Sequence, residues 1–196
     1  MLFSVGSMCF IIDRKLFKKL SILYFFMFDV VLNKNLVKYS KDFGFSKIYY
    51  VKDFKVIEGK NDRINRGAFE NRNTDVVYSL EKFRIKDKLH YRDSGLNQVL
   101  AKLAKKNRIK VGINFNDILN IEGEKRAIIL GRIMQNIRIC NKYKVDMIIG
   151  SFAKDKYGLR NGKDLVAFGK LLGMKKVWNE IDNFFKDEGI GIKRIK

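Results

Sequence analysis

The sequence contains no proline, one histidine and two cysteines. Cys9 and Cys140 lie far apart and outside any Cys-x-x-Cys spacing, so the sequence predicts neither a disulfide framework nor a zinc site. Because His90 is the only histidine, a hydrolase that holds its metal through several imidazoles is excluded, and a dense carboxylate cluster would be the other route to such a site. Turns must rely on Gly, Asn and Asp, since proline is absent.

Acidic residues are also scarce. The chain of 196 residues has 21 Asp and Glu against 41 Lys and Arg, which gives a net charge of +20. A folded protein with this excess repels itself unless a polyanion is near. Nucleic acid is the usual partner of such a chain, an anionic membrane surface is the second candidate, and a basic protein without a single ligand is the third. Because 46% of the residues are hydrophobic, one domain with a sizeable core is expected.

Residues 1–26 differ in pattern from the rest of the chain. An apolar stretch precedes the basic residues at 14–19, which is the reverse of the order in a signal peptide. The next apolar run, at 22–32, is interrupted by Asp29 and is shorter than the about 20 residues that span a bilayer. We expect residues 1–26 to be an extension upstream of a single domain at 27–196, with an amphipathic membrane anchor as the alternative. The expected location is the cytoplasm, with no membrane partner.

From Met27 onwards, strand-like runs alternate with helical patterns. This alternation predicts an α/β fold, and seven or eight strands favour a TIM-barrel-like β/α barrel, with an open doubly wound sheet as the alternative. No glycine-rich nucleotide-binding motif follows a strand. The expected strands are 28–32, 47–51, 55–57, 76–80, 89–91, 109–115, 145–149 and 190–195. The expected helices are 36–43, 94–107, 122–143, 161–172 and 178–185, and 59–73 is expected to be a long polar loop.

Residues 92–115 contain a complete helix and strand. Ser94 is the expected N-cap of the helix, and Asn107 is the expected left-handed stop. Asn161 is the expected N-cap of a later helix, with Asp164 in a variant of the capping box. Apolar residues at helical spacing define the buried faces: Leu96, Val99, Leu100, Leu103 and Ala104 in the first helix, and Ala127, Leu130, Ile133, Met134, Ile137 and Cys140 in the helix at 122–143.

Positive charge is concentrated at residues 82–110, which hold ten Lys or Arg and two Asp, a net charge of +8. This run is a plausible electrostatic footprint for RNA phosphates. A solvated helix face joined to a charged loop is the alternative. The candidates in this run are Arg84, Lys86, Arg92, Lys102, Lys105, Lys106 and Arg108.

A second group of polar residues follows the expected strands. Asn114, Asn116, Ser151 and Lys154 would gather at the carboxyl end of a barrel, where barrel enzymes carry their active sites. Apart from Asp117, neither a carboxylate pair nor a histidine accompanies them. They therefore suit binding to phosphate or sugar better than acid–base catalysis. Simple capping of strand ends is an equally good explanation.

Three segments of the chain resemble the RNase P protein component 3 family of archaea, the counterpart of a subunit of eukaryotic RNase P and RNase MRP. The first is YRDSGLNQVLAKLAKKNRIKVGINF at 91–115, which includes Ser94, Gly95 and Asn97. The second is EKRAIILGRIMQNIRICNKYKVDMIIGS at 124–151, where Arg126, Arg132, Asn136 and Arg138 resemble recurrent polar positions of the family. The third is YGLRNGKDLVAFGKLLGM at 157–174, which includes Arg160 and Asp164.

This resemblance implies a TIM-barrel-like fold similar to metal-dependent phosphoesterases of the PHP type, without the full set of metal ligands. It also implies a subunit of RNase P that binds the catalytic RNA beside a partner resembling RNase P protein component 2. Cleavage of the 5′ leader of precursor tRNA would be performed by the RNA with Mg²⁺, so no protein-bound cofactor or metal and no catalytic residue are expected. An autonomous phosphoesterase of the PHP type is the alternative, and a basic membrane-surface protein is a third hypothesis.

Two sets of site residues follow from these patterns and the resemblance. The residues expected to bind RNA are the seven candidates in the basic run together with Arg132, Arg138, Lys154 and Arg160. The polar motif residues are Ser94, Gly95, Asn97, Asn114, Ser151 and Asp164.

Overall fold

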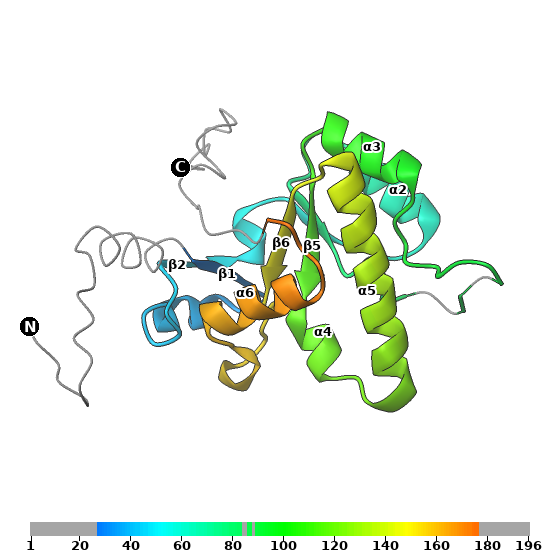
Figure 1. The fold of residues 1–196 in the computed structure, drawn as a ribbon. Helices are drawn as coiled ribbons and strands as arrows, with labels where there is room; N and C mark the ends of the chain where they lie inside the picture. The colour runs from blue at the N-terminus through cyan, green and yellow to red at the C-terminus, as the bar shows by residue number, and fades with distance from the viewer. Residues whose placement is uncertain (1–26, 84–85, 88, 177–196) are drawn as a thin grey trace, which may run out of the picture.

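A computed structural model of the chain describes residues 27–83, 86–87 and 89–176 (Figure 1). The expected extension at 1–26, the expected helix at 178–185 and the expected strand at 190–195 lie outside these residues. The described part contains six strands, and every paired strand is parallel to its neighbour. An α/β fold with parallel strands and helices in alternation is therefore confirmed.

The strands form two sheets. The first pairs β1 (Phe28–Val31) with β2 (Lys47–Tyr50), which are connected through the 3-10 helix η1 (Lys34–Tyr39). A second 3-10 helix, η2 (Val51–Asp53), leads into the other sheet. That sheet has the order β3-β4-β5-β6, formed by β3 (Val56–Glu58), β4 (Val76–Tyr78), β5 (Lys110–Asn114) and β6 (Met147–Gly150).

Backbone hydrogen bonds join the two sheets side by side. The Phe152 N–H donates to the Val30 carbonyl at 2.8 Å, and the Leu32 N–H donates to the Ala153 carbonyl at 2.9 Å. The segment that follows β6 therefore lies beside β1. The strands form one row in the order β3-β4-β5-β6-β1-β2, and their carboxyl ends lie along one edge because the pairing is parallel.

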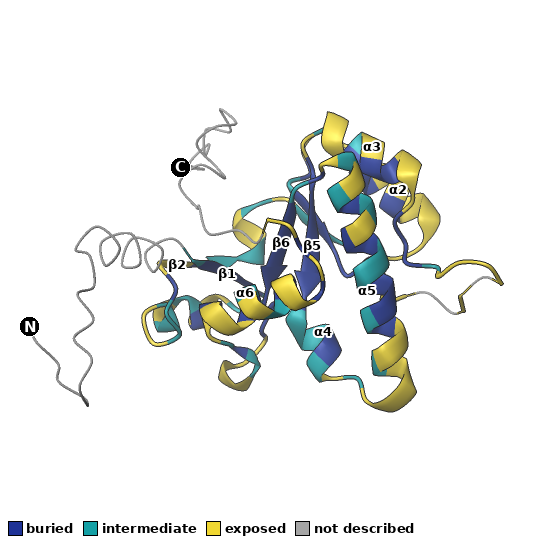
Figure 2. Ribbon diagram, viewed as in Figure 1, coloured by how far each residue is buried: buried dark blue, intermediate teal, exposed yellow. Residues whose placement is uncertain are grey.

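Both faces of the four inner strands, β4, β5, β6 and β1, are buried, as expected of a parallel sheet (Figure 2). On one face, side chains such as Val77, Val111 and Ile149 form a core with the apolar sides of the helices. On the other face, the rings of Tyr78 and Phe152 stack at 4.5 Å. The helices are α2 (Asp62–Glu70), α3 (Gln98–Lys106), α4 (Phe115–Leu119), α5 (Gly123–Tyr143) and α6 (Gly162–Leu171), and η3 (Lys156–Gly158) is a third 3-10 helix.

The expected loop at 59–73 is wrong, because this segment contains helix α2. The Asn61 side chain accepts a hydrogen bond from the Ile64 N–H at 2.9 Å and caps the helix. Ala68 and Phe69 are buried against the core. The helix was missed because its remaining residues are mostly polar, and its buried Asn65 accepts a hydrogen bond from the Lys60 N–H instead of filling an apolar position.

The boundaries expected around helix α3 are also wrong. Its N-cap is Asn97, whose side chain accepts from the Leu100 N–H at 2.9 Å, whereas Ser94 is buried three residues earlier. At the other end, Asn107 has a φ of −92° and Arg108 takes the left-handed conformation. Val99, expected on the buried face, is 53% exposed because the buried stripe of the helix runs along Leu100, Ala101 and Ala104. The strand expected at 89–91 is absent from the described residues.

Helices α5 and α6 follow the prediction more closely. Helix α5 spans almost the expected range and buries Cys140, although Ala127 is exposed and Ile129 takes its place in the core. Asn161 caps α6 by accepting from the Lys163 N–H at 3.0 Å, as predicted. The turn that follows α6 contains Gly173 at a φ of +97°, a conformation that glycine adopts without steric cost.

Candidate nucleic-acid interface

A cavity of about 450 Å³ lies at the carboxyl ends of the strands. Its walls come from the ends of β3, β4 and β5, from helix α4 and from the loop after β6. Asn114, Asn116 and Lys154 line it, and the Asn116 amide donates to the Ser151 carbonyl at 2.6 Å. The predicted gathering of these four residues at one edge of the sheet is therefore confirmed.

The charges in this cavity balance one another. The Lys82 ammonium lies 2.8 Å from a carboxylate oxygen of Asp117 and 3.3 Å from one of Glu58. A carboxylate pair was not expected here, because Glu58 was not recognised. It is the last residue of β3, so the rule that identified the other strand-end residues also applies to it. Lys82, which lies within the basic run, offsets one of these two charges. Over the whole lining, Lys82, Lys154 and Arg160 match the charges of Glu58, Asp117 and Asp155.

The pKa shifts in the cavity favour the ordinary protonation states. Burial, together with the negative charges of Glu58 and Asp117, raises the pKa of Tyr78 to about 12, so the phenol stays neutral. Burial lowers the pKa of Lys82, but its contacts with Asp117 and Glu58 outweigh this effect and the net shift is upward. Neither residue is tuned towards proton transfer at neutral pH.

Most polar groups at this edge already have internal partners. The Asn114 side chain caps α4 at the Asp117 N–H and donates to the Asp117 carboxylate at 2.9 Å. The Ser151 hydroxyl donates to Asp29 at 2.5 Å. Capping of strand ends therefore explains Asn114 and Ser151. Lys154 and Tyr157 remain as exposed side chains at the rim.

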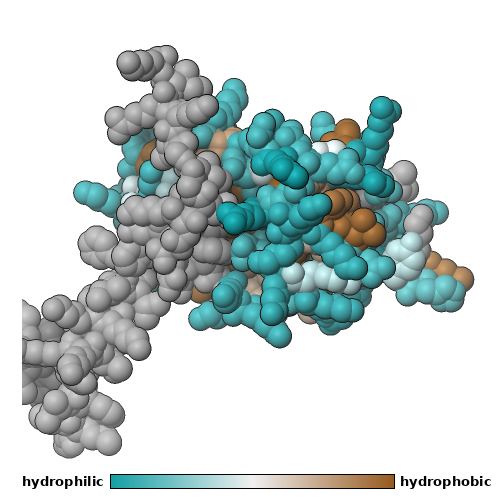
Figure 3. All heavy atoms as spheres, turned by 90° about the horizontal axis from the view of Figure 1, so that it is seen from above, coloured by the Kyte–Doolittle hydropathy of each residue, from teal (hydrophilic) through white to brown (hydrophobic). Residues whose placement is uncertain are grey.

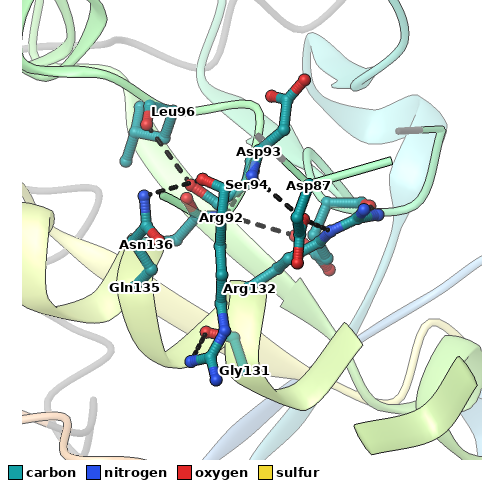
Figure 4. A network of polar contacts seen from close by, with 10 residues as sticks. Asp87, Arg92, Asp93, Ser94, Leu96, Gly131, Arg132, Gln135 and Asn136 are labelled. Atoms are coloured by element: carbon teal, nitrogen blue, oxygen red, sulfur yellow. Dashed lines mark hydrogen bonds and ion pairs between the residues drawn. The ribbon is translucent and has the colours of Figure 1, made fainter. Parts of the chain in front are cut away.

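A polar network ties helix α5 to the loop that precedes α3 (Figure 4). We call it the loop clamp, and its members are Glu81, Asp87, Arg92, Ser94, Gly131, Arg132, Gln135 and Asn136. The Arg132 guanidinium lies 2.7 Å from the Asp87 carboxylate and also donates to the Glu81 carbonyl. The Arg132 side chain is only 4% exposed. Predicted as an RNA ligand, it is placed by the structure in an internal network.

Two further contacts complete the loop clamp. The Asn136 amide donates to the Ser94 carbonyl at 2.9 Å, which holds the turn before α3. The Gln135 amide donates to the Arg92 carbonyl at 3.0 Å, while the Arg92 guanidinium reaches the Gly131 carbonyl at 3.4 Å (Figure 4). These contacts give the motif residues Ser94 and Asn136 a structural role.

Glu81 is the buried acid of the loop clamp. Its pKa is raised to about 7 overall: burial is the main cause and the charge of Asp117 adds to it, while hydrogen bonds from its own backbone and from Asn136, and the charge of Lys82, oppose the shift. Within the described residues, one oxygen of Glu81 and the side-chain oxygen of Asn136 both lack a hydrogen-bond partner. An ionised Glu81 can only accept hydrogen bonds, whereas a protonated Glu81 gains an O–H donor in this network.

A second hollow, of about 510 Å³, lies at the opposite end of the sheet. It is formed where α3 and α5 end and β6 begins. Lys105, one of the predicted RNA ligands, lines it. Sequence analysis missed the other lysines, because Lys144, Lys175 and Lys176 lie outside the basic run and only the fold brings them beside Lys105.

The structure also places the remaining candidates. Arg84 lies outside the described residues. Arg160 is partly buried and donates to the carbonyls of Tyr157 and Leu159, both at 2.7 Å. Gly95 has a φ of +78°, and Asp164 lies in the first turn of α6. The exposed candidates are Lys86, Arg92, Lys102, Lys105, Lys106, Arg108, Arg138 and Lys154, and their contact with RNA stays a prediction.

Two features of the described part of the chain concern metal ligands and membrane spans. No group of three or more His, Cys, Asp or Glu side chains is placed there to hold a metal ion. Among the helices described, none is long and apolar enough to cross a membrane.

These features define a basic α/β protein with parallel strands, a charge-balanced cavity at one end of its sheet and a lysine-lined hollow at the other. Residues 37–180 match the family model of RNase P subunit p30, and the chain therefore belongs to this family. The resemblance recognised in three sequence segments is confirmed.

Similar proteins come from archaea. Ribonuclease P protein component 3 of Methanocaldococcus jannaschii is 35% identical over 113 residues, which make up 58% of this chain and 46% of that protein. The component of the same name from Methanosarcina mazei is 30% identical over 124 residues, or 63% of this chain and 48% of that protein. The chain thus spans about half the length of the curated relatives it matches.

A solved structure extends this likeness to the fold. A chain in the cryo-EM structure of archaeal ribonuclease P with mature tRNA is 26% identical in sequence and superposes with a TM-score of 0.56. The match covers 88% of this chain and 80% of that chain.

Proposed function

We propose that this chain is a protein subunit of ribonuclease P, the ribonucleoprotein that removes the 5′ leader of precursor tRNA. Membership of the RNase P subunit p30 family carries this proposal. The relatives named ribonuclease P protein component 3 and the likeness to a chain of an archaeal ribonuclease P structure support it.

The charge of the chain suits this role. A net charge of +20 favours a partner that carries many phosphates, because Lys and Arg that neutralise phosphates release the counterions condensed on the nucleic acid. In this role the protein neutralises and positions the RNA backbone and leaves the cleavage chemistry to the RNA with Mg²⁺. The protein itself holds no cofactor, and no side chain of the chain acts as a catalyst.

The proposal includes partners and a location. The chain binds RNase P RNA beside a subunit that resembles RNase P protein component 2 and the other proteins of the complex. It meets precursor tRNA through this assembly, in the cytoplasm.

The proposed architecture is a TIM-barrel-like β/α barrel. The row of six parallel strands, with one face towards helices and the other lined by Tyr78 and Phe152, supports it. A closed TIM barrel has eight parallel strands, and the described residues contain six.

The alternative, a metal-dependent phosphoesterase of the PHP type, would use the cavity at the carboxyl ends of the strands. There the Lys82 ammonium already lies between the carboxylates of Glu58 and Asp117. Titration of the purified chain with Mn²⁺, followed by calorimetry, tests this alternative. Tight stoichiometric binding would favour the phosphoesterase, and its absence favours the RNA-binding subunit.

Direct binding to RNA tests the proposed function. The purified full chain is titrated into labelled archaeal RNase P RNA and, separately, into an unrelated structured RNA of equal length. We expect tighter binding to RNase P RNA, with an affinity that falls steeply as salt is raised. Equal affinity for both RNAs would contradict the proposal, because it would show that the chain binds RNA without specificity.

A further inference from the structure

The lysines at the amino end of the sheet converge from three separate elements. Lys105 lies in the last turn of α3, Lys144 directly follows α5, and Lys175 and Lys176 lie beyond the end of α6. All four line the hollow of about 510 Å³. Figure 3 looks down on this end of the molecule, where hydrophilic side chains predominate.

The hollow carries an excess of positive charge that the described residues do not neutralise. Asp146 is the one acidic residue in its lining. Within the described part of the chain, none of the four lysines forms an ion pair with a carboxylate. The cavity at the opposite end differs, because there Lys82 is paired with two carboxylates.

Helix ends alone do not account for this cluster. Lysine in the last turn of a helix is stabilised by the partial negative charge of the exposed carbonyls, and this explains Lys105 taken singly. Lys175 and Lys176, however, come after the turn that ends α6, where this effect has faded. Ammonium groups that share one hollow repel one another, and this repulsion disfavours the cluster. An anion bound between the ammonium groups would offset the repulsion.

We propose that the hollow lined by Lys105, Lys144, Lys175 and Lys176 binds backbone phosphates of RNA. This proposal rests on the proposed function and gives it a location at the amino end of the sheet. Lysine acts as a point charge that contacts phosphate without reading sequence, so the hollow fixes the position of the RNA and does not select bases. Lys102, Lys106 and Arg108, which are close to Lys105 in the sequence, are also exposed.

The test compares two triple variants of equal charge. The first, the hollow variant, removes charge from the hollow through Lys105→Gln, Lys144→Asn and Lys175→Gln. Asparagine is chosen at position 144 because this residue has a φ of 56°, a conformation that asparagine tolerates. The control carries Lys34→Gln, Lys41→Gln and Lys52→Gln, which are exposed positions outside the lining. Both are titrated over a salt series into archaeal RNase P RNA and, in a separate arm, into precursor tRNA.

Each lost phosphate contact lowers the slope of log affinity against log salt by about 0.7 to 0.9. We expect the magnitude of this slope to fall by about 2 in the hollow variant, and the variant to bind RNA at least about tenfold more weakly than the wild type. The slope and the affinity of the control variant should stay near those of the wild type. The arm that shows the loss identifies the RNA whose phosphates occupy the hollow. Equal losses in the two variants would overturn the proposed site while leaving the proposed function intact. A wild-type chain that binds neither RNA would overturn both.

Two measurements keep the test decisive if the hollow variant folds poorly. Lys105→Arg, Lys144→Arg and Lys175→Arg together keep the charge and should keep the salt slope. In the wild-type chain, acetylation of lysines followed by mass spectrometry should show protection of the four hollow lysines by RNA, and none at Lys34, Lys41 and Lys52. Uniform protection of all seven lysines, or none, would contradict the site.

Discussion

The buried carboxylate of Asp29 accepts two hydrogen bonds from Ser151, one from its backbone N–H at 2.6 Å and one from its hydroxyl at 2.5 Å. The two residues are 122 positions apart in the chain. Asp29 lies in β1 and Ser151 directly follows β6. This contact therefore fastens the β1–β2 pair to the four-stranded sheet, next to the backbone hydrogen bonds of Val30 and Leu32.

Ser151→Ala should lower the free energy of unfolding by about 1 to 3 kcal/mol, because it leaves one oxygen of the buried Asp29 carboxylate without its hydroxyl donor. Urea denaturation measures the change. Ser46→Ala is the control: the Ser46 hydroxyl donates one hydrogen bond, to the Met27 carbonyl, but it lies in an exposed setting. A loss no larger for Ser151→Ala than for the control would contradict a fastening role.

Two buried acids should make stability fall as the pH rises. Burial raises the pKa of Asp29 from 3.8 to about 6 and that of Glu81 from 4.5 to about 7. Between each pair of values the native state binds more protons than the unfolded state, so the free energy of unfolding decreases with rising pH. The stabilisation that each acid gives the native state is complete below its lower pKa, that of the unfolded state, and is lost above its higher pKa, that of the folded state.

Glu81→Gln isolates one of these acids. The variant should match the wild type near pH 4 and become more stable by up to about 3 kcal/mol at pH 8, because the wild type then carries a buried charge. The introduced amide can also donate to the Asn136 oxygen that lacks a partner within the described residues. Urea denaturation at a series of pH values gives the difference. If the difference in free energy of unfolding between the variant and the wild type did not change with pH, Glu81 would not titrate between pH 4 and pH 8.

The fold was predictable where local signals agreed. Helix α5, which has 21 residues, was predicted from the apolar stripe between Ala127 and Cys140. Asn161 was predicted as an N-cap because it precedes another apolar stripe. Helix α2 was missed because Asn65, a buried residue in its centre, satisfies a backbone N–H and interrupts the apolar pattern. Ser94 was mistaken for a cap: its hydroxyl donates to the Leu96 carbonyl at 3.4 Å, and its own carbonyl accepts from the Asn136 side chain, which is 42 residues away in sequence.

The candidate sites were predictable only in part, for the same reason. Asn114, Asn116 and Lys154 were found because strand ends in a parallel sheet meet at one edge. The pairing of Lys82 with Glu58 and the meeting of Lys105 with Lys144 depend on how strands and helices pack across the sheet. No spacing in the sequence encodes these contacts.

Arg132→Ala should destabilise the fold by about 2 kcal/mol, because it breaks the ion pair with Asp87 and frees the loop clamp. Hydrogen exchange should increase in residues 89–96. Arg138→Ala, an exposed change on the same helix, serves as the control and should cost less than about 0.5 kcal/mol. Unchanged exchange in this loop would show that Arg132 does not hold it.

Gly131 and Arg92 should be energetically coupled. A Cβ atom at position 131 would lie 2.7 Å from Cζ of Arg92, so the guanidinium must move when alanine is introduced. In an Arg92→Ala background, Gly131→Ala should stabilise α5 by about 0.5 to 1 kcal/mol through its higher helix propensity. With Arg92 present this gain should shrink or vanish. Additive effects in the double-mutant cycle, measured by thermal denaturation, would argue against the contact.

The most direct test of the central claim is 5′-leader removal from precursor tRNA. The purified chain is assayed alone, and archaeal RNase P RNA with Mg²⁺ and the other protein subunits is assayed with and without it. We predict no cleavage by the chain alone and a clear increase in cleavage when it joins the RNA and proteins. Cleavage by the chain alone, or no effect of adding it to the complex, would contradict its assignment as an RNA-binding subunit of ribonuclease P.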